Sequence, residues 1–432
     1  MRCFSTSCWG RRAPVAANPA PAAFTFIQRT TPVLTSPAAT PAKETDDQIR
    51  ARLIAAAREL APRIAARAAA DEKARRISDD TIREAGEAGF FRIMVPKSMG
   101  GYELDWETVC RVIVEAGRYD GSSAWQLGFF IMHNWLWLGL SEQAQEEVYG
   151  PKGYSTGPVM LAPAVKARKV DGGFVLNGRS RWATGINHAE WVFVSTMVEG
   201  EEKLGFRDFM IPAGEVIVHE NWDVAGMCAT GSHDVEYPDL FVPAHRSANL
   251  TAAFSGENPD ILLHKGPKYR IPRFTSMIFG SSSPLVALAH GAVETFRKKV
   301  EGYTSPVTGG RTIDNIPAVN RLAKAQIRLD AAEQYLYSIA RRMLEWNTEA
   351  PLTQLQRVQI RAGVVHVTNE AREIVQSVAA TSGSGAYTLD QPMQRYLRDV
   401  SMMATHFYHD QDTGYEPLGR VMVGLDPNTR LA

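Results

Sequence analysis

The chain has 432 residues, 45% apolar and 22% charged, and its 47 Lys and Arg residues balance 47 Asp and Glu residues. This composition is typical of a globular protein long enough for two or three domains. A zero formal net charge leaves no electrostatic footprint for nucleic acid or an anionic membrane, so we expect a small-molecule substrate. We predict no membrane span, because no apolar run reaches about 18 residues.

The four cysteines form no C-x-x-C pair, and no Cys/His cluster has the spacing of a zinc site, so we predict no metal. So few cysteines suit a reducing compartment, and we expect a cytoplasmic location. Residues 1–43 contain no Asp or Glu and are rich in Ala, Pro, Ser and Thr, which predicts a disordered N-terminal extension. It is an organellar transit peptide, an ordinary tail, or the result of a start codon placed too far upstream.

Residues 44–150 are predicted as a helical domain. Apolar residues recur at helical spacing after Asp46, and helical patterns continue over 106–118 and 122–140. The stretch 122–140 is apolar on most faces and rich in Trp and Phe, so we expect it to lie deep in the protein.

From 151 to 255 the pattern changes to short alternating runs between glycine turns, which predicts a small antiparallel β domain. The Asp171-Gly172-Gly173 turn between 165–170 and 174–177 is a hairpin signal. Further strands are expected over the following ranges: 191–197, 206–211, 216–219 and 235–242. After a loop at 255–272, helical periodicity from Phe274 to about Tyr408 predicts an antiparallel bundle within 256–432.

Four short motifs, in this order along the chain, resemble those of the acyl-CoA dehydrogenase superfamily. Residues 96–101 resemble its P-x-x-x-G-G loop, and 176–185 resemble L-N-G-x-K-x-W-I-T-N. Residues 239–243 resemble D-x-x-V-P, and 383–399 resemble G-G-x-G-Y followed by R-x-x-R-D. The similarity covers about residues 45–415. It implies an α+β fold with an N-terminal helical domain, a small antiparallel β domain and a C-terminal four-helix bundle.

Two departures point away from a dehydrogenase. Residues 157–163 read Gly-Pro-Val-Met-Leu-Ala-Pro, where acyl-CoA dehydrogenases have T-E-P-x-A-G-S-D. No carboxylate stands in 403–409, where many of them place a catalytic Glu; His406 is there instead. Both departures resemble the two-component flavin monooxygenases of the superfamily. Their W-x-(S/T)-G-x-x-H-A-x-W segment is matched by Trp182, Thr184, Gly185, His188, Ala189 and Trp191.

The resemblance implies a reaction of reduced flavin with O2 through a C4a-hydroperoxyflavin, which needs a dry pocket with few polar groups. His133 is expected to take the proton of a phenol, and Thr184 to donate a hydrogen bond to the flavin or peroxide. His406, expected in the final helix, would bind substrate or the peroxide. Each residue also has a structural interpretation. His133 is then a core histidine satisfied by backbone, Thr184 a turn residue, and His406 part of a solvated face with His409.

No G-x-G-x-x-G follows a strand, so no nicotinamide site is expected, and a separate NAD(P)H-dependent flavin reductase is the predicted partner. The flavin is FMNH2 or FADH2, and its ring is expected at Trp182, Ala183, Thr184 and Gly185. Trp182 either stacks beside it or packs in the β core. Donors for the flavin phosphate are expected from Thr230, Ser232, Ser382, Gly383, Ser384 and Gly385. In the resembling family this last turn reaches a neighbouring subunit, which implies a homotetramer.

The sequence therefore predicts a flavin-dependent monooxygenase that hydroxylates an aromatic or polycyclic small molecule. Two alternatives stay open: an acyl-CoA dehydrogenase or oxidase acting on a thioester, and a flavoenzyme that oxidises nitrogen.

Overall fold

The computed structural model describes residues 44–248 and 263–429. The N-terminal extension lies outside this range, as do parts of the loop expected at 255–272. Residues from Glu44 onward group into one unit, so the boundaries expected near 150 and 255 stay predictions.

Between residues 44 and 158, five α-helices precede the strands. They are α1 (Asp46–Ala74), α2 (Asp79–Glu87), α3 (Trp106–Ala116), α4 (Gly121–Leu136) and α5 (Glu142–Tyr149). Thr45 caps α1 with a capping box, and Asp120 caps α4 by accepting from the Ser123 N–H at 2.8 Å. As expected from its composition, α4 is buried along nearly its whole length. Its burial places the side chains of its middle turns inside the molecule.

The strands form two four-stranded sheets. They are β1 (Val159–Leu161), β2 (Lys166–Val170), β3 (Gly173–Ala183), β4 (Trp191–Met197), β5 (Phe206–Pro212), β6 (Ile217–His219), β7 (His233–Pro243) and β8 (Ser247–Ala248). The strand orders are β1-β4-β5-β8 and β2-β3-β7-β6. Among the described strands, neighbours pair antiparallel except β1 and β4, which run parallel. The predicted hairpin and the later strands are confirmed, whereas β1 and β8 are too short to show alternation.

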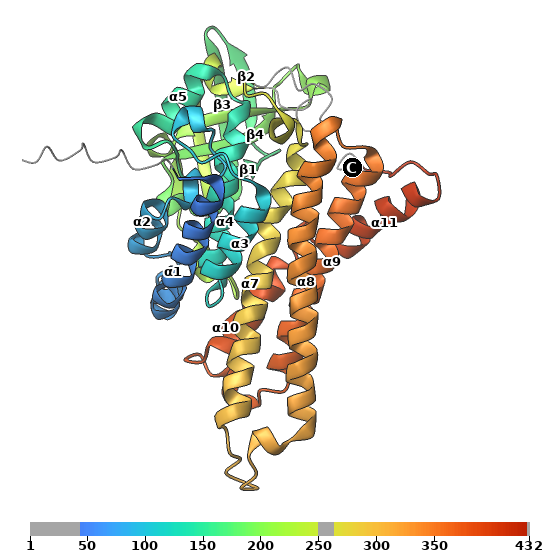
Figure 1. Cartoon of the computed structure of the whole chain (residues 1–432). Helices are drawn as coiled ribbons and strands as arrows, with labels where there is room; N and C mark the ends of the chain where they lie inside the picture. The colour runs from blue at the N-terminus through green and yellow to red at the C-terminus, as the bar shows by residue number, and fades with distance from the viewer. Residues whose placement is uncertain (1–43, 249–262, 430–432) are drawn as a thin grey trace, which may run out of the picture. The chain divides into compact units, whose positions relative to one another are not determined.

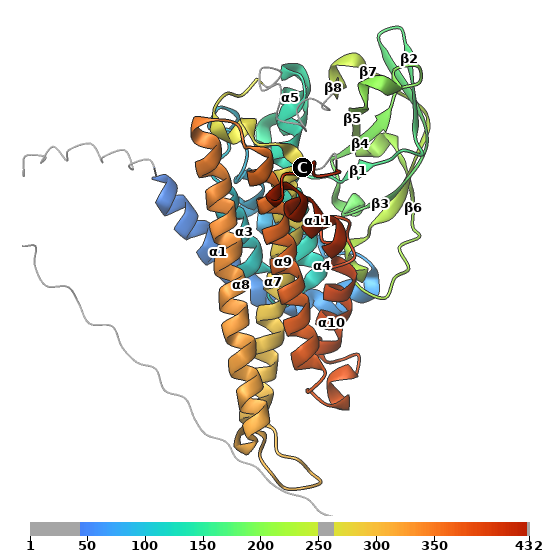
Figure 2. The ribbon, with the colours of Figure 1, turned by 90° about the vertical axis from the view of Figure 1, so that its right-hand side faces the viewer.

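The C-terminal part is helical. Its helices are α7 (Arg273–Gly302), α8 (Ile316–Glu349), α9 (Gln354–Ala379), α10 (Pro392–Met403) and α11 (Gln411–Met422). Helices α7, α8 and α9 run alongside one another, α10 packs against α7 and α9, and α11 packs against α9 (Figures 1 and 2). The predicted fold class, with its three successive regions, is confirmed. The helix that we predicted to about Tyr408 ends earlier, at Met403, and a turn leads into α11.

Among the described helices, α7 is the one long and apolar enough to cross a membrane. However, 94% of its most apolar window is buried inside the protein, against α3, α4, α8 and α9. Such burial is typical of the core helix of a folded domain. Helix α7 also packs against α4, which carries several of the residues of the candidate active site.

Candidate active site

One face of α4 carries a ladder of rings, one at each turn: Trp125, Phe129, His133 and, just after the helix, Trp137. Residues four positions apart lie above one another on a helix, so these rings contact in sequence. The ring centroids are 4.8 Å apart for Trp125 and Phe129, 5.2 Å for Phe129 and His133, and 6.3 Å for His133 and Trp137. The imidazole of His133 is therefore enclosed between aromatic side chains.

His133 is 1% exposed, and its two ring nitrogens have different surroundings. Its Nδ1 lies 2.7 Å from the carbonyl oxygen of Gly157, which can only accept, so the proton belongs on Nδ1. Its Nε2 is buried and has no hydrogen-bond partner among the described residues. Burial lowers the pKa of His133 from 6.5 to about 4, so the ring is neutral near pH 7. The backbone therefore provides a hydrogen-bond partner for Nδ1 alone, and the lone pair of Nε2 stays available. A core histidine satisfied by backbone describes only half of this ring.

His406 reaches the same ladder from the turn after α10. Its ring centroid lies 5.5 Å from that of Trp125 and 6.4 Å from that of Phe129. Burial lowers its pKa from 6.5 to about 4. We predicted that His406 lies in the final helix. This is wrong, because α10 ends at Met403 and α11 begins at Gln411. The alternative of a solvated pair with His409 is also wrong, because His409 is buried and its pKa lies well below 6.5 for that reason.

The end of β3 brings the predicted flavin residues beside α4. Trp182 is 61% exposed and has a φ of 66°, so the alternative that it packs in the β core is wrong. Ala183 is buried, and Gly185 has a φ of 75°. A Cβ at Gly185 would lie 2.7 Å from Phe130 and 2.8 Å from Gln126, so this turn fits tightly against α4.

Three hydroxyl groups form a chain behind this turn. Thr184 Oγ1 lies 3.0 Å from Ser232 Oγ, which lies 2.8 Å from Thr230 Oγ1, which donates to the Met227 carbonyl at 2.9 Å. A hydroxyl has one proton, and a carbonyl only accepts. Ser232 must therefore donate to Thr230, and Thr184 must donate to Ser232.

The direction of this chain corrects one expectation. We predicted that Thr184 donates to the flavin or peroxide, but its single proton is already used within the protein. What Thr184 Oγ1 has left is an acceptor lone pair.

The loop that carries this chain is held in place from two helices. Asp399 of α10 accepts from the Met227 N–H at 2.6 Å, and Ser122 of α4 accepts from the Ala229 N–H at 3.2 Å. Met227 and Gly231 both have positive φ values, 53° and 52°. A non-glycine residue in this region is strained, so the surrounding contacts must stabilise the loop. Burial, and next the charge of Asp120, raise the pKa of Asp399 to about 7.

The Ser382–Gly385 turn does not join this chain. The Ser382 hydroxyl donates to the Val378 carbonyl in the last turn of α9 at 2.7 Å, and the Ser382 carbonyl accepts from Lys299. Gly383, Ser384 and Gly385 are exposed and present backbone groups to their surroundings. This turn therefore lies on the surface of the bundle in the single chain.

Sequence reasoning missed two site residues and misjudged a third. Asn134 and Asp399 shape the site through hydrogen bonds to backbone, and such contacts leave no periodic signal; Asp399 stood in a quoted motif without a role. We gave His188 no role beyond its place in the motif, but its side chain is only 6% exposed. Its Nδ1 lies 3.1 Å from Gln126 Nε2, so it helps join the β3 turn to α4.

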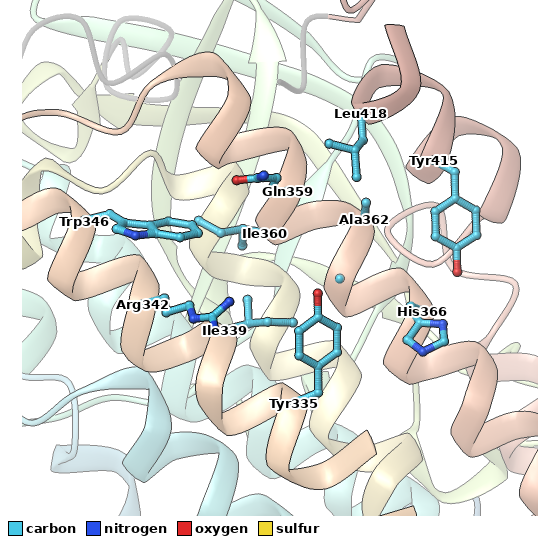
Figure 3. Close-up of a pocket in the computed structure, with 11 residues that line it drawn as sticks. Tyr335, Ile339, Arg342, Trp346, Gln359, Ile360, Ala362, His366, Tyr415 and Leu418 are labelled. Carbon is cyan, nitrogen blue, oxygen red and sulfur yellow. The ribbon is translucent and has the colours of Figure 1, made fainter. Parts of the chain in front are cut away.

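A cleft of about 390 Å³ lies elsewhere, between α8, α9 and α11 (Figure 3). Tyr335, Trp346, His366 and Tyr415 line it with apolar neighbours, and none of the predicted site residues does. Within residues 44–248 and 263–429, no group of three or more His, Cys, Asp and Glu side chains is placed to hold a metal.

Comparisons with known proteins agree with this architecture. Residues 43–153 match the family model of the acyl-CoA dehydrogenase N-terminal domain, and residues 279–411 match that of the C-terminal domain. The flavin-dependent monooxygenase oxygenase subunit HsaA of Rhodococcus jostii (strain RHA1) is 30% identical over 374 residues. That alignment covers 85% of this chain and 97% of the relative.

Two solved structures have the same fold along most of their length. The 3-HSA hydroxylase from Rhodococcus sp. RHA1 superposes with a TM-score of 0.81 at 29% identity, covering 89% of this chain and 99% of that one. XiaF from Streptomyces sp., in complex with FADH2 and glycerol, has a TM-score of 0.81 at 26% identity and covers 89% and 98%.

The chain belongs to the acyl-CoA dehydrogenase family. Within that family it is an oxidoreductase, the oxygenase component of a flavin-dependent monooxygenase, as the resemblance implied.

Proposed function

We propose that this enzyme hydroxylates an aromatic or polycyclic small molecule, with reduced flavin and O2 as its co-reactants. The observation that carries the proposal is the unpartnered Nε2 of His133, buried among Trp125, Phe129 and Trp137. A buried acceptor without a partner is costly unless a ligand supplies the donor. The hydroxyl of a phenol-like substrate is such a donor, and the surrounding rings suit an aromatic guest.

The residues at the end of β3 fit a flavin. Trp182 offers an exposed ring for stacking, and Thr184 offers a lone pair to an N–H. The Gly185 N–H already donates to the Thr230 carbonyl at 3.0 Å, so Gly185 would contribute a close approach of the turn and not a donor. Thr230 and Ser232 do not contact the flavin in this proposal. They fix the direction in which the Thr184 hydroxyl donates its proton. A bound reduced flavin, FMNH2 or FADH2, would supply the oxygen chemistry, which we expect to run through a C4a-hydroperoxyflavin.

His133 acts as the general base in this proposal. Because burial lowers its pKa to about 4, Nε2 is unprotonated at neutral pH and can accept the substrate hydroxyl proton, although the same burial makes the imidazole a weaker base than one in water. Proton removal raises the electron density of the aromatic ring, and a positioned base contributes roughly 10²–10⁴-fold. His406 binds the substrate from the turn after α10, and Trp125 and Phe129 keep water out.

An oxygenase component works with a reductase, and we propose an NAD(P)H-dependent flavin reductase as the partner. We also propose a homotetramer, in which the exposed Gly383–Gly385 backbone reaches the flavin of a neighbouring subunit. A cytoplasmic location, or an organellar one if residues 1–43 act as a transit peptide, stays a proposal.

The test is single-turnover hydroxylation. Purified protein is mixed with reduced FMN or FAD, then with isotopically labelled O2 and a panel of phenols and polycyclic phenols. We expect labelled hydroxylated product, and His133→Ala should release hydrogen peroxide instead while binding flavin normally. A parallel assay supplies acyl-CoAs and an electron-accepting dye. Dye reduction by an acyl-CoA, with no labelled product from any aromatic compound, would overturn the proposal.

A further inference from the structure

Asn134 is the neighbour of the proposed base and is fully buried. Its carboxamide makes three hydrogen bonds. Its Nδ2 donates to the Ser155 carbonyl and to the Phe130 carbonyl, each at 2.8 Å, and its Oδ1 accepts from the Ser155 N–H at 2.9 Å. The side chain thus pairs with both backbone groups of Ser155, much as a neighbouring strand would.

Two residues further along the chain, the carbonyl of Gly157 contacts His133 Nδ1. On its other side the segment 155–158 is fixed to the start of β4, because the Thr156 carbonyl accepts from the Glu190 N–H at 2.8 Å. Gly157 packs so closely there that a Cβ would lie 1.8 Å from the Trp191 carbonyl oxygen. Pro158 restricts Gly157 to extended conformations, and lacks an N–H of its own. Further bonds hold the segment on the β4 side: the Pro158 carbonyl accepts from the Phe193 N–H at 3.0 Å, and the Thr156 hydroxyl donates to the His188 carbonyl at 2.6 Å. Asn134 attaches the segment to α4.

We propose that Asn134 is a positioning residue that fixes the tautomer of His133. Asn134 fixes the backbone of Ser155, and residues 155–157 fix the position of the Gly157 carbonyl. That carbonyl accepts the Nδ1 proton of His133, so Nε2 is left unprotonated. The inference rests on the proposed function, because only a general base needs an unprotonated Nε2 that faces the substrate. Without Asn134, the segment keeps its bonds to β4 but loses its attachment to α4, the helix that carries His133. The bond between His133 and the Gly157 carbonyl is then less well fixed, and the imidazole can carry its proton on Nε2, where it cannot accept another.

The variant for the test is Asn134→Leu, which keeps the size of the side chain and removes all three hydrogen bonds. Asn134→Asp is the second variant, because it keeps the acceptor for the Ser155 N–H and removes the two N–H donors to the Ser155 and Phe130 carbonyls. Two matched controls exist. Asn369→Leu removes a buried asparagine of α9 whose Nδ2 donates to the Val365 carbonyl at 2.8 Å. Ser155→Ala changes the same segment but leaves the backbone groups that Asn134 binds.

The main measurement is the nitrogen-15 spectrum of histidine-labelled full-length protein, with the His133 signals assigned from His133→Gln. Wild type and both controls should show a protonated Nδ1 and an unprotonated Nε2. The Asn134 variants should show a mixed or inverted tautomer. Product formation should fall roughly tenfold to a hundredfold, as when the outer partner of a functional histidine is removed, and hydrogen peroxide should account for the difference.

An unchanged His133 tautomer in the folded Asn134 variants would overturn the role of Asn134. A tautomer that changes equally in the Asn369→Leu control would overturn it too, because the effect would then be one of general stability. If the wild type hydroxylates no aromatic compound, the proposed function fails, and the spectra still show whether Asn134 fixes the imidazole. The two failures are therefore distinguishable.

Discussion

Asp399 in α10 accepts a hydrogen bond from the backbone N–H of Met227 at 2.6 Å, across 172 positions of sequence. This bond fastens the loop of the hydroxyl chain to the helix bundle. Asp399 is buried, and its Oδ2 has no hydrogen-bond partner among the described residues. The carboxyl group therefore has a structural task that its neutral form can also perform.

Asp399→Asn should preserve the bond to Met227 and change how stability depends on pH. The pKa of Asp399 is raised from 3.8 to about 7, so the folded state holds a proton that the unfolded state has lost. Its contribution is fully present below about pH 4 and is lost as pH rises through about 7. The advantage of Asp399→Asn over wild type should therefore grow from about pH 5 to about pH 8, as measured by urea unfolding.

Asp399→Leu serves as the contrasting variant. It leaves the Met227 N–H without its acceptor and should lower the free energy of unfolding by about 1–3 kcal/mol relative to Asp399→Asn. Equal stabilities of the two variants across the pH range would show that the bond does not hold the loop.

Ser232→Ala should reduce the preference for reduced flavin. In the wild type, Thr184 presents a lone pair, which suits the N5–H of reduced flavin and opposes the N5 lone pair of oxidised flavin. Without Ser232, the Thr184 proton is free to face the flavin, so the oxidised form gains a donor. A neutral hydrogen bond contributes about 0.5–1.5 kcal/mol, so the ratio of the two dissociation constants should shift by up to about tenfold.

The measurement is equilibrium binding of both redox forms under anaerobic conditions. Ser180→Ala is the matched control, because Ser180 is also a buried serine with a hydroxyl partner, Tyr237, at 3.0 Å, but lies outside the chain. A similar shift in that control would contradict the assigned direction of the chain.

The rate of hydroxylation should show no ionisation of the base near pH 6.5. Burial lowers the pKa of His133 to about 4, so Nε2 is already unprotonated throughout the range from about pH 5 to about pH 8. Single-turnover rates of product formation across this range provide the test. A rise with a midpoint near 6.5 that disappears in His133→Ala would mean that the imidazole is solvated when it acts.

Trp182→Gly should leave the free protein at least as stable as wild type and weaken flavin binding. The side chain is 61% exposed, so little packing is lost, and glycine removes the strain of a φ of 66°. Flavin affinity should fall by roughly tenfold or more, in line with about 1–3 kcal/mol for a stacked ring. Thermal unfolding and flavin titration measure the two effects, and an unchanged flavin affinity would remove Trp182 from the binding site.

The sequence was sufficient for the order of the regions and for the elements with strong periodicity. The apolar run of α4 predicted its burial, and alternation predicted the strands from β2 to β7. What it did not show were contacts between distant segments. The bond between Asn134 and Ser155 depends on how the chain returns to α4, and the use of the Thr184 proton depends on a carbonyl 43 residues away, at Met227.

The turn after α10 shows the same limit. Helical periodicity through Met403 gave no reason to end the helix before His406, because the residues that follow are compatible with a helix. The turn that brings the imidazole back to Phe129 is stabilised by burial of His409 and Tyr408, which is a tertiary effect.

The direction of the hydroxyl chain has a consequence for how the enzyme responds to its surroundings. Neither serine nor threonine ionises at any pH where proteins stay folded, and the chain is anchored on a backbone carbonyl. Acid, base and salt therefore cannot reverse it, and only a substitution within the chain can. Whatever pH dependence is measured must come from groups outside this hydroxyl chain.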